Sequence, residues 1–537
     1  MNGARLLRQA TRHRPDVAIQ LRLGGYILQA PRFAKNDAMK VRSTRTGYRA
    51  IWLLLLAAGL GPVQAATPGR TEPPGPAVPE RFSAAELYPA ATVQSAVVAD
   101  EAWWKVFGDP VLDAIVAKAR ESNSSIHEAA ARLEQSRALL RGAAAARKPQ
   151  VGGGGSASQR TGPLVNEAGQ GGRLLNSGAI LSYEIDLLGR LSKSERAVRL
   201  DAEASAELLR HARLLVEADT VQTYFEICAL NEERSILAKA ADDQGATLKI
   251  LEQRERNGLA TRLAVNRARA EIAAVRSDID DLDRRRAELA ANLGLLMGEA
   301  PSTLAVPARL GTPPVIPPDI PSAVIARRPD ISAGLRSVEA ARARIGVAKV
   351  SWLPSLSLTG AQGFASPSLG SLLSSATQNF GLGFLFSIPG LDGGRHKARV
   401  RSARADLSLA SAEYSTQLLT ALRDVDNQLS AVRILGDRAA TLRSIADDDE
   451  LLARMLHARY ANGLISQLDY VEGLRDVLDH QRTAVQVNIE RYVATIGLIR
   501  ALGGGWGAPQ PGPERLASGG SAAGAATSAQ PATTATR

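Results

Sequence analysis

The residues that could carry out chemistry are scattered along this sequence and do not form a recognisable constellation. The six histidines have no metal-ligand spacing and no Cys-x-x-Cys companions: His13, His127, His211, His396, His457 and His480. The glycine run at 152–155 is not followed by Lys-Ser/Thr, so it is no phosphate-binding loop. One acidic run predicts a solvated helix face: Asp447, Asp448, Asp449 and Glu450. We therefore predict no enzyme, no metal site and no cofactor.

Three pairs of motifs recur at one fixed spacing of 205 residues. They are Lys148-Pro149 with Leu353-Pro354, Gly189-Arg190 with Gly394-Arg395, and Asn257-Gly258-Leu259 with Asn462-Gly463-Leu464. Because all three pairs keep the same register, they indicate a tandem duplication. Each copy reads as strand, loop, strand, very long helix, tight turn and helix.

Four short segments have the pattern of strands: 151–159, 179–185, 355–359 and 380–388. Alternation of small or polar residues with apolar ones is typical of a strand with two different faces. The first is the weakest, because successive glycines have no side chains to pack. About ten residues is the length of a tilted strand that crosses a bilayer. Strands of a soluble sheet remain an alternative from the pattern alone.

Two long stretches, 191–256 and 397–461, contain no proline and one glycine each. A helix of that length is about 100 Å long. Apolar residues follow a coiled-coil spacing in both stretches, at Leu214, Ala218, Val221, Phe225 and Cys228, and at Leu418, Leu422, Val425, Leu429 and Val432. Such helices predict an elongated molecule with strands at one end.

Four strands per chain cannot close a membrane barrel, and open sheet edges are not tolerated in hydrocarbon. The smallest membrane barrels have about eight strands. The chain is therefore expected to share its barrel with further copies of itself. Three copies would give twelve strands, although this argument alone does not fix the number.

The N-terminal region has the order of a secretory signal peptide at 39–65. Basic residues follow Met39, an apolar run of about ten residues comes next, and cleavage is expected between Ala65 and Ala66. Residues 1–38 are then expected to be an upstream extension that is not translated. Residues 1–49 contain eleven Arg or Lys and two Asp, which is +9 of the net charge of +11. These residues are expected to be absent from the mature chain, which then carries little net charge. We therefore expect no nucleic acid as a partner.

The single cysteine, Cys228, excludes an intramolecular disulfide and is expected to lie in the core. No cysteine follows the apolar signal run, so no acyl anchor is expected. The predicted organisation is an N-terminal periplasmic segment, a first repeat, a proline-rich linker, a second repeat and a disordered tail, at 66–101, 102–299, 300–323, 324–506 and 507–537.

Several segments together resemble the TolC/NodT-type outer membrane factor family, over about residues 102–506. The segments are Trp104 to Leu112 (WKVFGDPVL), Arg328 to Ile331 (RPDI), Leu353 to Gly360 (LPSLSLTG), Arg459 to Asp469 (RYANGLISQLD) and Arg500 to Trp506 (RALGGGW). The resemblance implies an α+β membrane protein built from a tandem-duplicated unit. Four strands would contribute to a trimeric twelve-stranded outer-membrane β-barrel, and long periplasmic coiled-coil helices would form an α-barrel tunnel.

The same resemblance implies an outer membrane channel of a tripartite, RND-type efflux system, exporting drugs, metals or other small molecules. Its partners would be two further copies of the chain, a periplasmic adaptor, an inner-membrane RND pump and outer-membrane lipid. One alternative is the duct of a type I protein secretion system, which an ABC exporter gene nearby would favour. The alternative of another class is a periplasmic coiled-coil structural protein without a pore.

The resemblance also transfers functional residues by position. The periplasmic mouth would be closed by Leu468, Asp469 and Glu472, with Tyr460 holding it shut by hydrogen bonding and Arg267 or Arg262 supplying counter-charge. In the first copy, Ala264 occupies the position equivalent to Asp469, so the contacts that close the mouth would differ between the copies. The adaptor would dock on two helix-turn tips, at Asn257, Gly258 and Leu259 and at Asn462, Gly463 and Leu464.

We expect the mature protein to begin at Ala66 and translation to begin at Met39, because the basic, apolar and small-residue segments follow in that order. N-terminal sequencing of the protein purified from the cell envelope tests this. A mature chain that begins before Met39 would contradict both parts.

Overall fold

The computed structural model describes residues 102–160, 172–300, 306–307, 310–316 and 327–505. The expected signal peptide, the Ala65–Ala66 cleavage site, the segment 66–101 and the tail from 507 lie outside these residues. So does much of the predicted linker, and the domain boundaries stay predictions.

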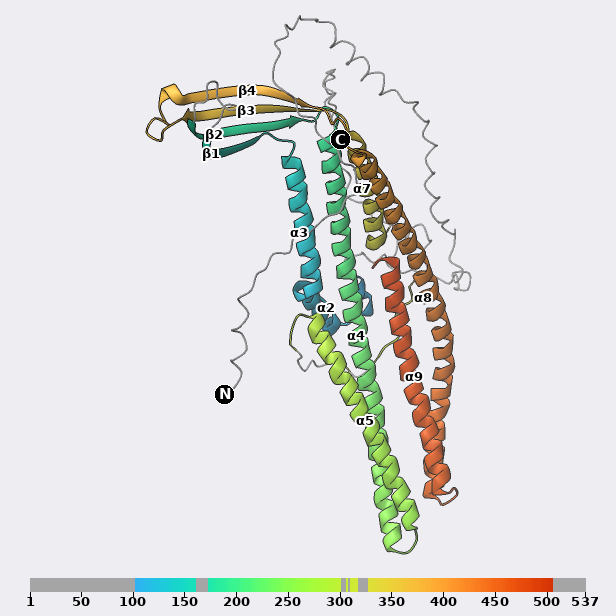
Figure 1. Cartoon of the computed structure of the whole chain (residues 1–537). Helices are drawn as coiled ribbons and strands as arrows, with labels where there is room; N and C mark the ends of the chain where they lie inside the picture. Colours follow the sequence, from blue (N-terminus) through green and yellow to red (C-terminus); the bar gives the residue numbers. More distant parts are fainter. Residues whose placement is uncertain (1–101, 161–171, 301–305, 308–309, 317–326, 506–537) are drawn as a thin grey trace, which may run out of the picture. The chain divides into compact units, whose positions relative to one another are not determined.

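Helices form most of the described chain, and two of them are 67 residues long. The elements in order are η2 (Trp103–Phe107), α2 (Pro110–Ser122), α3 (Ser124–Ala145), α4 (Arg190–Arg256), α5 (Arg262–Leu296), α7 (Pro329–Val350), η4 (Ser375–Thr377), α8 (Arg395–Ala461) and α9 (Gln467–Leu502). The two long helices predicted from the sequence are confirmed as α4 and α8, each about 100 Å long. Figure 1 shows α4 paired with α5, and α8 paired with α9, as two helical hairpins.

The four predicted strands are confirmed, and each is a strand of one antiparallel sheet in the order β1-β2-β3-β4. They are β1 (Gln150–Arg160), β2 (Gly172–Ile185), β3 (Ser355–Ser366) and β4 (Gln378–Ser387). The glycine-rich β1 pairs with β2 along its whole length, because backbone hydrogen bonds do not need side chains. The glycines weaken side-chain packing but leave the ladder intact.

The strand register gathers apolar side chains on one face of the sheet. Leu358 lies opposite Tyr183 on one side and Phe384 on the other, and Leu356 lies opposite Ile185 and Phe386. Phe384 and Phe386 are 69% and 61% exposed within the single chain. Large apolar side chains on an uncovered face, alternating with small or polar ones, are typical of the lipid-facing side of a membrane barrel.

Two glycines allow β2 and β3 to approach closely. Gly178 and Gly363 are directly paired in the register. A Cβ atom built on Gly363 would lie 2.3 Å from the carbonyl oxygen of Ser177 and 2.7 Å from the Cα of Gly178. A side chain at either position therefore requires the two backbones to separate.

Four helices connect directly to the sheet: α3, α4, α7 and α8. The helices α3 and α7 lead into β1 and β3, and α4 and α8 follow β2 and β4. Both long helices begin after a glycine in the left-handed region, Gly189 with φ 70° and Gly394 with φ 90°. The tight turns that end α4 and α8 therefore lie at the far ends of these helices.

The main core lies where α4 meets α2, α9 and the N-terminal η2. All five predicted seam residues of α4 are buried, and Val425 and Leu429 of α8 lie in the same cluster, whereas the buried Leu418 packs with Ile331 of α7. The predicted place of Cys228 is confirmed, since it is 2% exposed in this cluster. The rings of Phe107, Phe225 and Tyr492 pack together, with the Phe225 and Tyr492 centroids 4.3 Å apart.

The acidic run at 447–450 is not the uniformly solvated face that we expected. Asp448 and Glu450 are exposed, but Asp449 is only 4% exposed and lies 3.0 Å from Nδ1 of His480 on α9. Successive residues of a helix are rotated by about 100°, so one member of a four-residue run necessarily points at a neighbouring helix. The prediction was wrong for Asp449.

A buried carboxylate fastens the N-terminal segment to α4. Glu217 is 5% exposed, accepts a hydrogen bond from Nε1 of Trp103 at 3.1 Å and lies 3.2 Å from Nε of Arg120. Burial raises the pKa of Glu217 to about 7, although Arg120 and the Trp103 hydrogen bond oppose that rise. Nearby, the Tyr224 hydroxyl donates to Asp109, the N-cap of α2.

Replacing Gly363 with Ala is expected to reduce the yield of folded, heat-modifiable oligomer in outer-membrane fractions several-fold, because the new Cβ would overlap β2. Electrophoresis of unheated samples measures the yield. Gly370→Ala, in the loop between β3 and β4, is the control, since nothing lies within 4 Å of its Cβ position and it belongs to no strand. Equal losses for the two variants would contradict the close approach of β2 and β3.

Glu217 is expected to make stability depend on pH. Its pKa is raised on folding, so its protonated form stabilises the fold fully below about pH 4.5, and this stabilisation is lost as the pH rises through about 7. At neutral to alkaline pH the buried charge costs at most on the order of 3 kcal/mol. Thermal unfolding midpoints of wild type and Glu217→Gln should therefore differ in their pH dependence between these limits, with the variant flatter. Parallel curves would show that Glu217 titrates normally.

Candidate functional site at the helix turns

The two turns at the far ends of the long helices have the same backbone geometry. Gly258 and Gly463 adopt φ of 73° and 68°, which lets the chain reverse without strain. The next amide closes each turn: Leu259 donates to the carbonyl of Arg254 at 2.7 Å, and Leu464 donates to the carbonyl of Arg459 at 2.8 Å. The repeated Asn-Gly-Leu motif therefore encodes one turn, used twice.

Each turn presents an apolar side chain to its surroundings. Leu259 is 77% exposed and Leu464 is 73% exposed, and both flank an exposed Asn-Gly pair. Asn462 is held by a hydrogen bond from its Nδ2 to the carbonyl of Ala458 at 2.8 Å. A rigid loop that exposes a leucine can contact an apolar groove of another protein.

The residues expected at the mouth lie in the first two turns of α9. Leu468 is 50% exposed, and Asp469 and Glu472 are exposed as well. Asp469 has a local role that the sequence analysis missed, because it forms a capping box with Ser466. The Asp469 amide donates to Oγ of Ser466 at 3.1 Å, and the Ser466 amide donates to Oδ2 of Asp469 at 3.2 Å.

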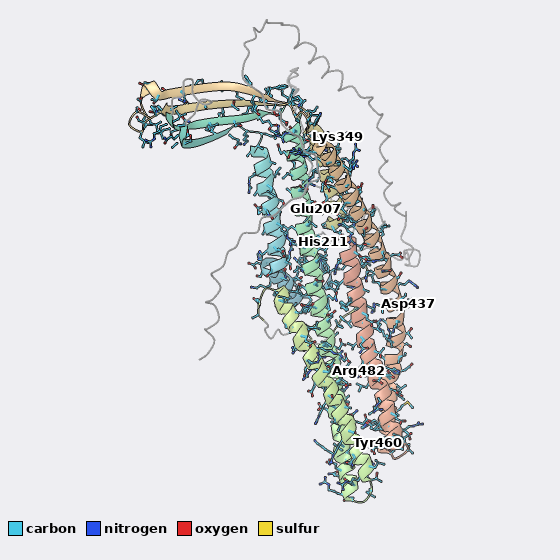
Figure 2. The ribbon with its side chains drawn as sticks, in the orientation of Figure 1. Glu207, His211, Lys349, Asp437, Tyr460 and Arg482 are labelled. Atoms are coloured by element: carbon cyan, nitrogen blue, oxygen red, sulfur yellow. The ribbon has the colours of Figure 1, made fainter. Side chains whose placement is uncertain are left out.

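Tyr460 contacts its surroundings through its ring. It stacks on Tyr470 of α9 with centroids 4.6 Å apart and 8° between planes, and the Arg254 guanidinium lies 5.9 Å from the Tyr460 centroid. Tyr470 is 5% exposed, and its hydroxyl lies 3.3 Å from Nδ1 of His457. Figure 2 labels Tyr460 close to the turn of α8. This aromatic pair joins α8 to α9, and Arg254 adds a contact from α4 to Tyr460.

Arg267 is exposed on α5, and it occupies the position equivalent to Glu472 in the other copy, 205 residues earlier. Arg262 is exposed at the start of α5, and Ala264 takes the place of Asp469. The two copies thus have opposite charges at one equivalent position. Among the described residues of the single chain, Arg267 and Glu472 do not form an ion pair with each other.

Three ion pairs between the hairpins, formed by two arginines of α9, were not expected from the sequence. The Arg475 guanidinium on α9 lies 2.5 Å and 2.6 Å from the two carboxylate oxygens of Glu271 on α5. Closer to the core, Arg482 reaches Glu233 on α4 at 2.8 Å and Asp278 on α5 at 3.1 Å. Figure 2 labels Arg482 farther from the turn than Tyr460. Glu271 holds the pKa of Arg475 above its ordinary value.

No sequence signal distinguishes these arginines from others on α9, because their partners lie on another hairpin and are set by how the hairpins pack. Within the described residues no cluster of three or more His, Cys, Asp or Glu side chains could hold a metal ion. No described helix is long and apolar enough to span a bilayer. The arrangement supplies surfaces and charges at the turns.

The sequence matches the family described as outer membrane efflux protein in two consecutive stretches, 115–299 and 320–504. These two matches follow the tandem repeat and take in both helical hairpins and all four strands.

Individual relatives agree over nearly their whole length. The probable outer membrane lipoprotein SilC of Salmonella typhimurium is 27% identical over 450 residues, covering 82% of this chain and 95% of SilC. Outer membrane protein OprJ of Pseudomonas aeruginosa is 28% identical over 461 residues, covering 84% of this chain and 95% of OprJ. The solved structure of the outer-membrane channel OprN superposes with a TM-score of 0.72 at 27% identity, covering 82% of this chain and 99% of OprN.

Proposed function

Because the chain belongs to the outer membrane efflux protein family, we propose that it is the outer-membrane duct of a tripartite efflux system, carrying drugs, metals or other small molecules out of the cell. The protein is an outer membrane channel whose strands belong to a β-barrel and whose long helices form a periplasmic tunnel. The observation that supports the duct most strongly is one unit, repeated, that joins spanning strands to helices about 100 Å long.

The proposed assembly is a homotrimer. The sheet order leaves β1 and β4 as edges of a four-stranded sheet. An edge in hydrocarbon leaves unpaired amides and carbonyls, each costing several kcal/mol. Pairing β1 of one copy with β4 of the next removes every edge, and three copies give a twelve-stranded barrel.

The proposed gate lies at the periplasmic mouth. There the N-terminal ends of α5 and α9 from three copies would surround one axis. Equivalent positions of the two repeats would alternate around that ring, so Arg267 and Glu472 would alternate in charge. Opposite charges at neighbouring positions attract, which favours a narrow mouth. Leu468 and Asp469 would stand one turn closer to the tip, with Tyr460 holding α8 against α9 through Tyr470.

Opening requires the α8–α9 hairpin to move relative to the α4–α5 hairpin. Two described contacts oppose that motion at the mouth: the Arg475–Glu271 ion pair and the Arg254 guanidinium against the Tyr460 ring. Both involve exposed groups, so each contributes modestly and can be exchanged for other contacts. A mouth closed by several weak contacts can open without unfolding either hairpin.

A periplasmic adaptor, itself joined to an inner-membrane RND pump, is the proposed partner of the two helix-turn tips. Leu259 and Leu464 would enter apolar grooves between its helices, with Asn257 and Asn462 beside them. Docking can open the mouth only if the adaptor binds the open state more tightly than the closed one. Transport through the duct has no chemical step, since the pump supplies the energy.

Removing the two mouth carboxylates with Asp469→Asn and Glu472→Gln is expected to raise single-channel conductance several-fold and to weaken cation preference. Asn at 469 keeps an acceptor for the Ser466 amide, so the capping box survives. Loss of Glu472 leaves Arg267 without an opposite charge, which widens the mouth. Planar-bilayer recording of the purified trimer measures both quantities.

The control is Asp448→Asn with Glu450→Gln, two exposed carboxylates on α8; Asp449 is unsuitable because it is buried against His480. A charge swap sharpens the test. Arg267→Glu alone should open the mouth, and Arg267→Glu with Glu472→Arg should close it again. Equal conductance in the mouth and control variants would contradict the gate while leaving the duct intact.

A further inference from the structure

The first three turns of α8 carry an unusual density of positive charge. Five of the ten residues from Arg395 to Arg404 are Arg or Lys. Three of them, Lys397, Arg401 and Arg404, are exposed and spaced i, i+4 and i+7, so they form one line along the helix. These three residues are called the α8 basic stripe. It is about 10 Å long.

The equivalent helix of the first copy has a buried carboxylate among its cations. Glu195 of α4 is 8% exposed and pairs with Arg199 at 2.6 Å and Arg147 at 2.7 Å. The position of Glu195 is taken by Val400 in the second copy, 205 residues later. Among the described residues, no carboxylate lies within salt-bridge distance of the α8 basic stripe.

The stripe is unfavourable for α8 in isolation. Like charges spaced i, i+4 and i, i+3 repel, each pair costing about 0.2–0.5 kcal/mol. Cations in the first turns of a helix also oppose its dipole. Since neither cost is offset within the described chain, an anionic group outside it is the natural counterpart.

The stripe begins just beyond the border of the membrane sheet. The strand β4 ends at Ser387, and the residues that follow include Ile388, 62% exposed, and Leu391, fully exposed. Trp352, at the entry to β3, packs against His396 in the first turn of α8, with ring centroids 5.4 Å apart and 39° between planes. Trp and exposed aliphatic residues mark the boundary between hydrocarbon and headgroups. Lys349, at the end of α7, adds a further cation near the sheet (Figure 2).

We propose that the α8 basic stripe binds the headgroups of anionic phospholipids in the periplasmic leaflet of the outer membrane. Headgroups occupy several ångströms beyond the hydrocarbon core, which is the depth reached by the first turns of a helix that follows a spanning strand. The long Lys and Arg side chains can also reach back along the helix toward the phosphate groups of the leaflet, as such side chains do at membrane interfaces. The inference rests on the outer-membrane placement of the barrel and adds a lipid partner for a surface outside it.

The test reconstitutes the purified trimer in vesicles of phosphatidylethanolamine and phosphatidylglycerol at a three-to-one ratio. Spin-labelled phosphatidylglycerol and spin-labelled phosphatidylcholine then report which lipid is held at the protein surface. The wild type should prefer phosphatidylglycerol by about five-fold, the effect of one cation at an anionic surface. The preference should fall as salt is raised. The variant Lys397→Gln, Arg401→Gln, Arg404→Gln should lose it.

Two further variants separate charge from folding. Lys397→Arg, Arg401→Lys, Arg404→Lys keeps the charge and should keep the preference. Arg276→Gln, Arg454→Gln, Arg459→Gln removes three exposed cations far from the sheet and should also keep it. A stripe variant that retains the lipid preference would overturn the proposal. If the stripe variant kept the lipid preference but changed ion selectivity, the stripe would line the tunnel instead. If the stripe variant lost the trimer, the stripe would pair with a neighbouring copy of the chain. Either result would also overturn the proposal.

Conductance recorded from the same preparations keeps the two proposals apart. A wild type that selects phosphatidylglycerol but conducts no ions would contradict the duct and leave the lipid site standing.

Discussion

Backbone hydrogen bonding in hydrocarbon is the constraint on which the rest of this chain depends. The four strands satisfy one another only within the sheet, and the outer edges of β1 and β4 remain. In a bilayer those edges must be paired, and other copies of the chain are the available partners. Once the strands are shared, the helices that follow each strand pair are arranged around the same axis, and a barrel continues as a tunnel.

The tandem repeat determines the shape of the chain, and differences between the copies determine where its charged side chains lie. Both copies have the same glycine start to the long helix and the same Asn-Gly-Leu turn. At equivalent positions, however, the residues differ: Val400 of the second copy replaces Glu195 of the first, Asp469 replaces Ala264, and Glu472 replaces Arg267. Near the membrane, the first copy therefore has a buried carboxylate that pairs with two arginines, whereas the second copy has an apolar residue there and leaves its cations for lipid. At the mouth the two copies carry complementary charges.

Features that depend on local pattern could be predicted from the sequence. The strands, the two 67-residue helices, the seam through Val221 and Leu429, and the buried Cys228 all follow from periodicity and the repeat. Features that depend on packing between hairpins could not. Asp449 is buried because His480 lies opposite it, and a single sequence does not show that contact. The Arg475–Glu271 pair and the Tyr460–Tyr470 stack were missed for the same reason.

The proposed channel requires three copies of the chain to share one barrel. Native mass spectrometry of the protein, extracted from outer membranes in mild detergent, tests this most directly because it counts subunits. One dominant species with three copies of the mature chain is expected, and it should dissociate only under denaturing conditions. A folded species containing one or two copies would contradict it, since four or eight strands from this sheet would leave the proposed twelve-stranded barrel unformed.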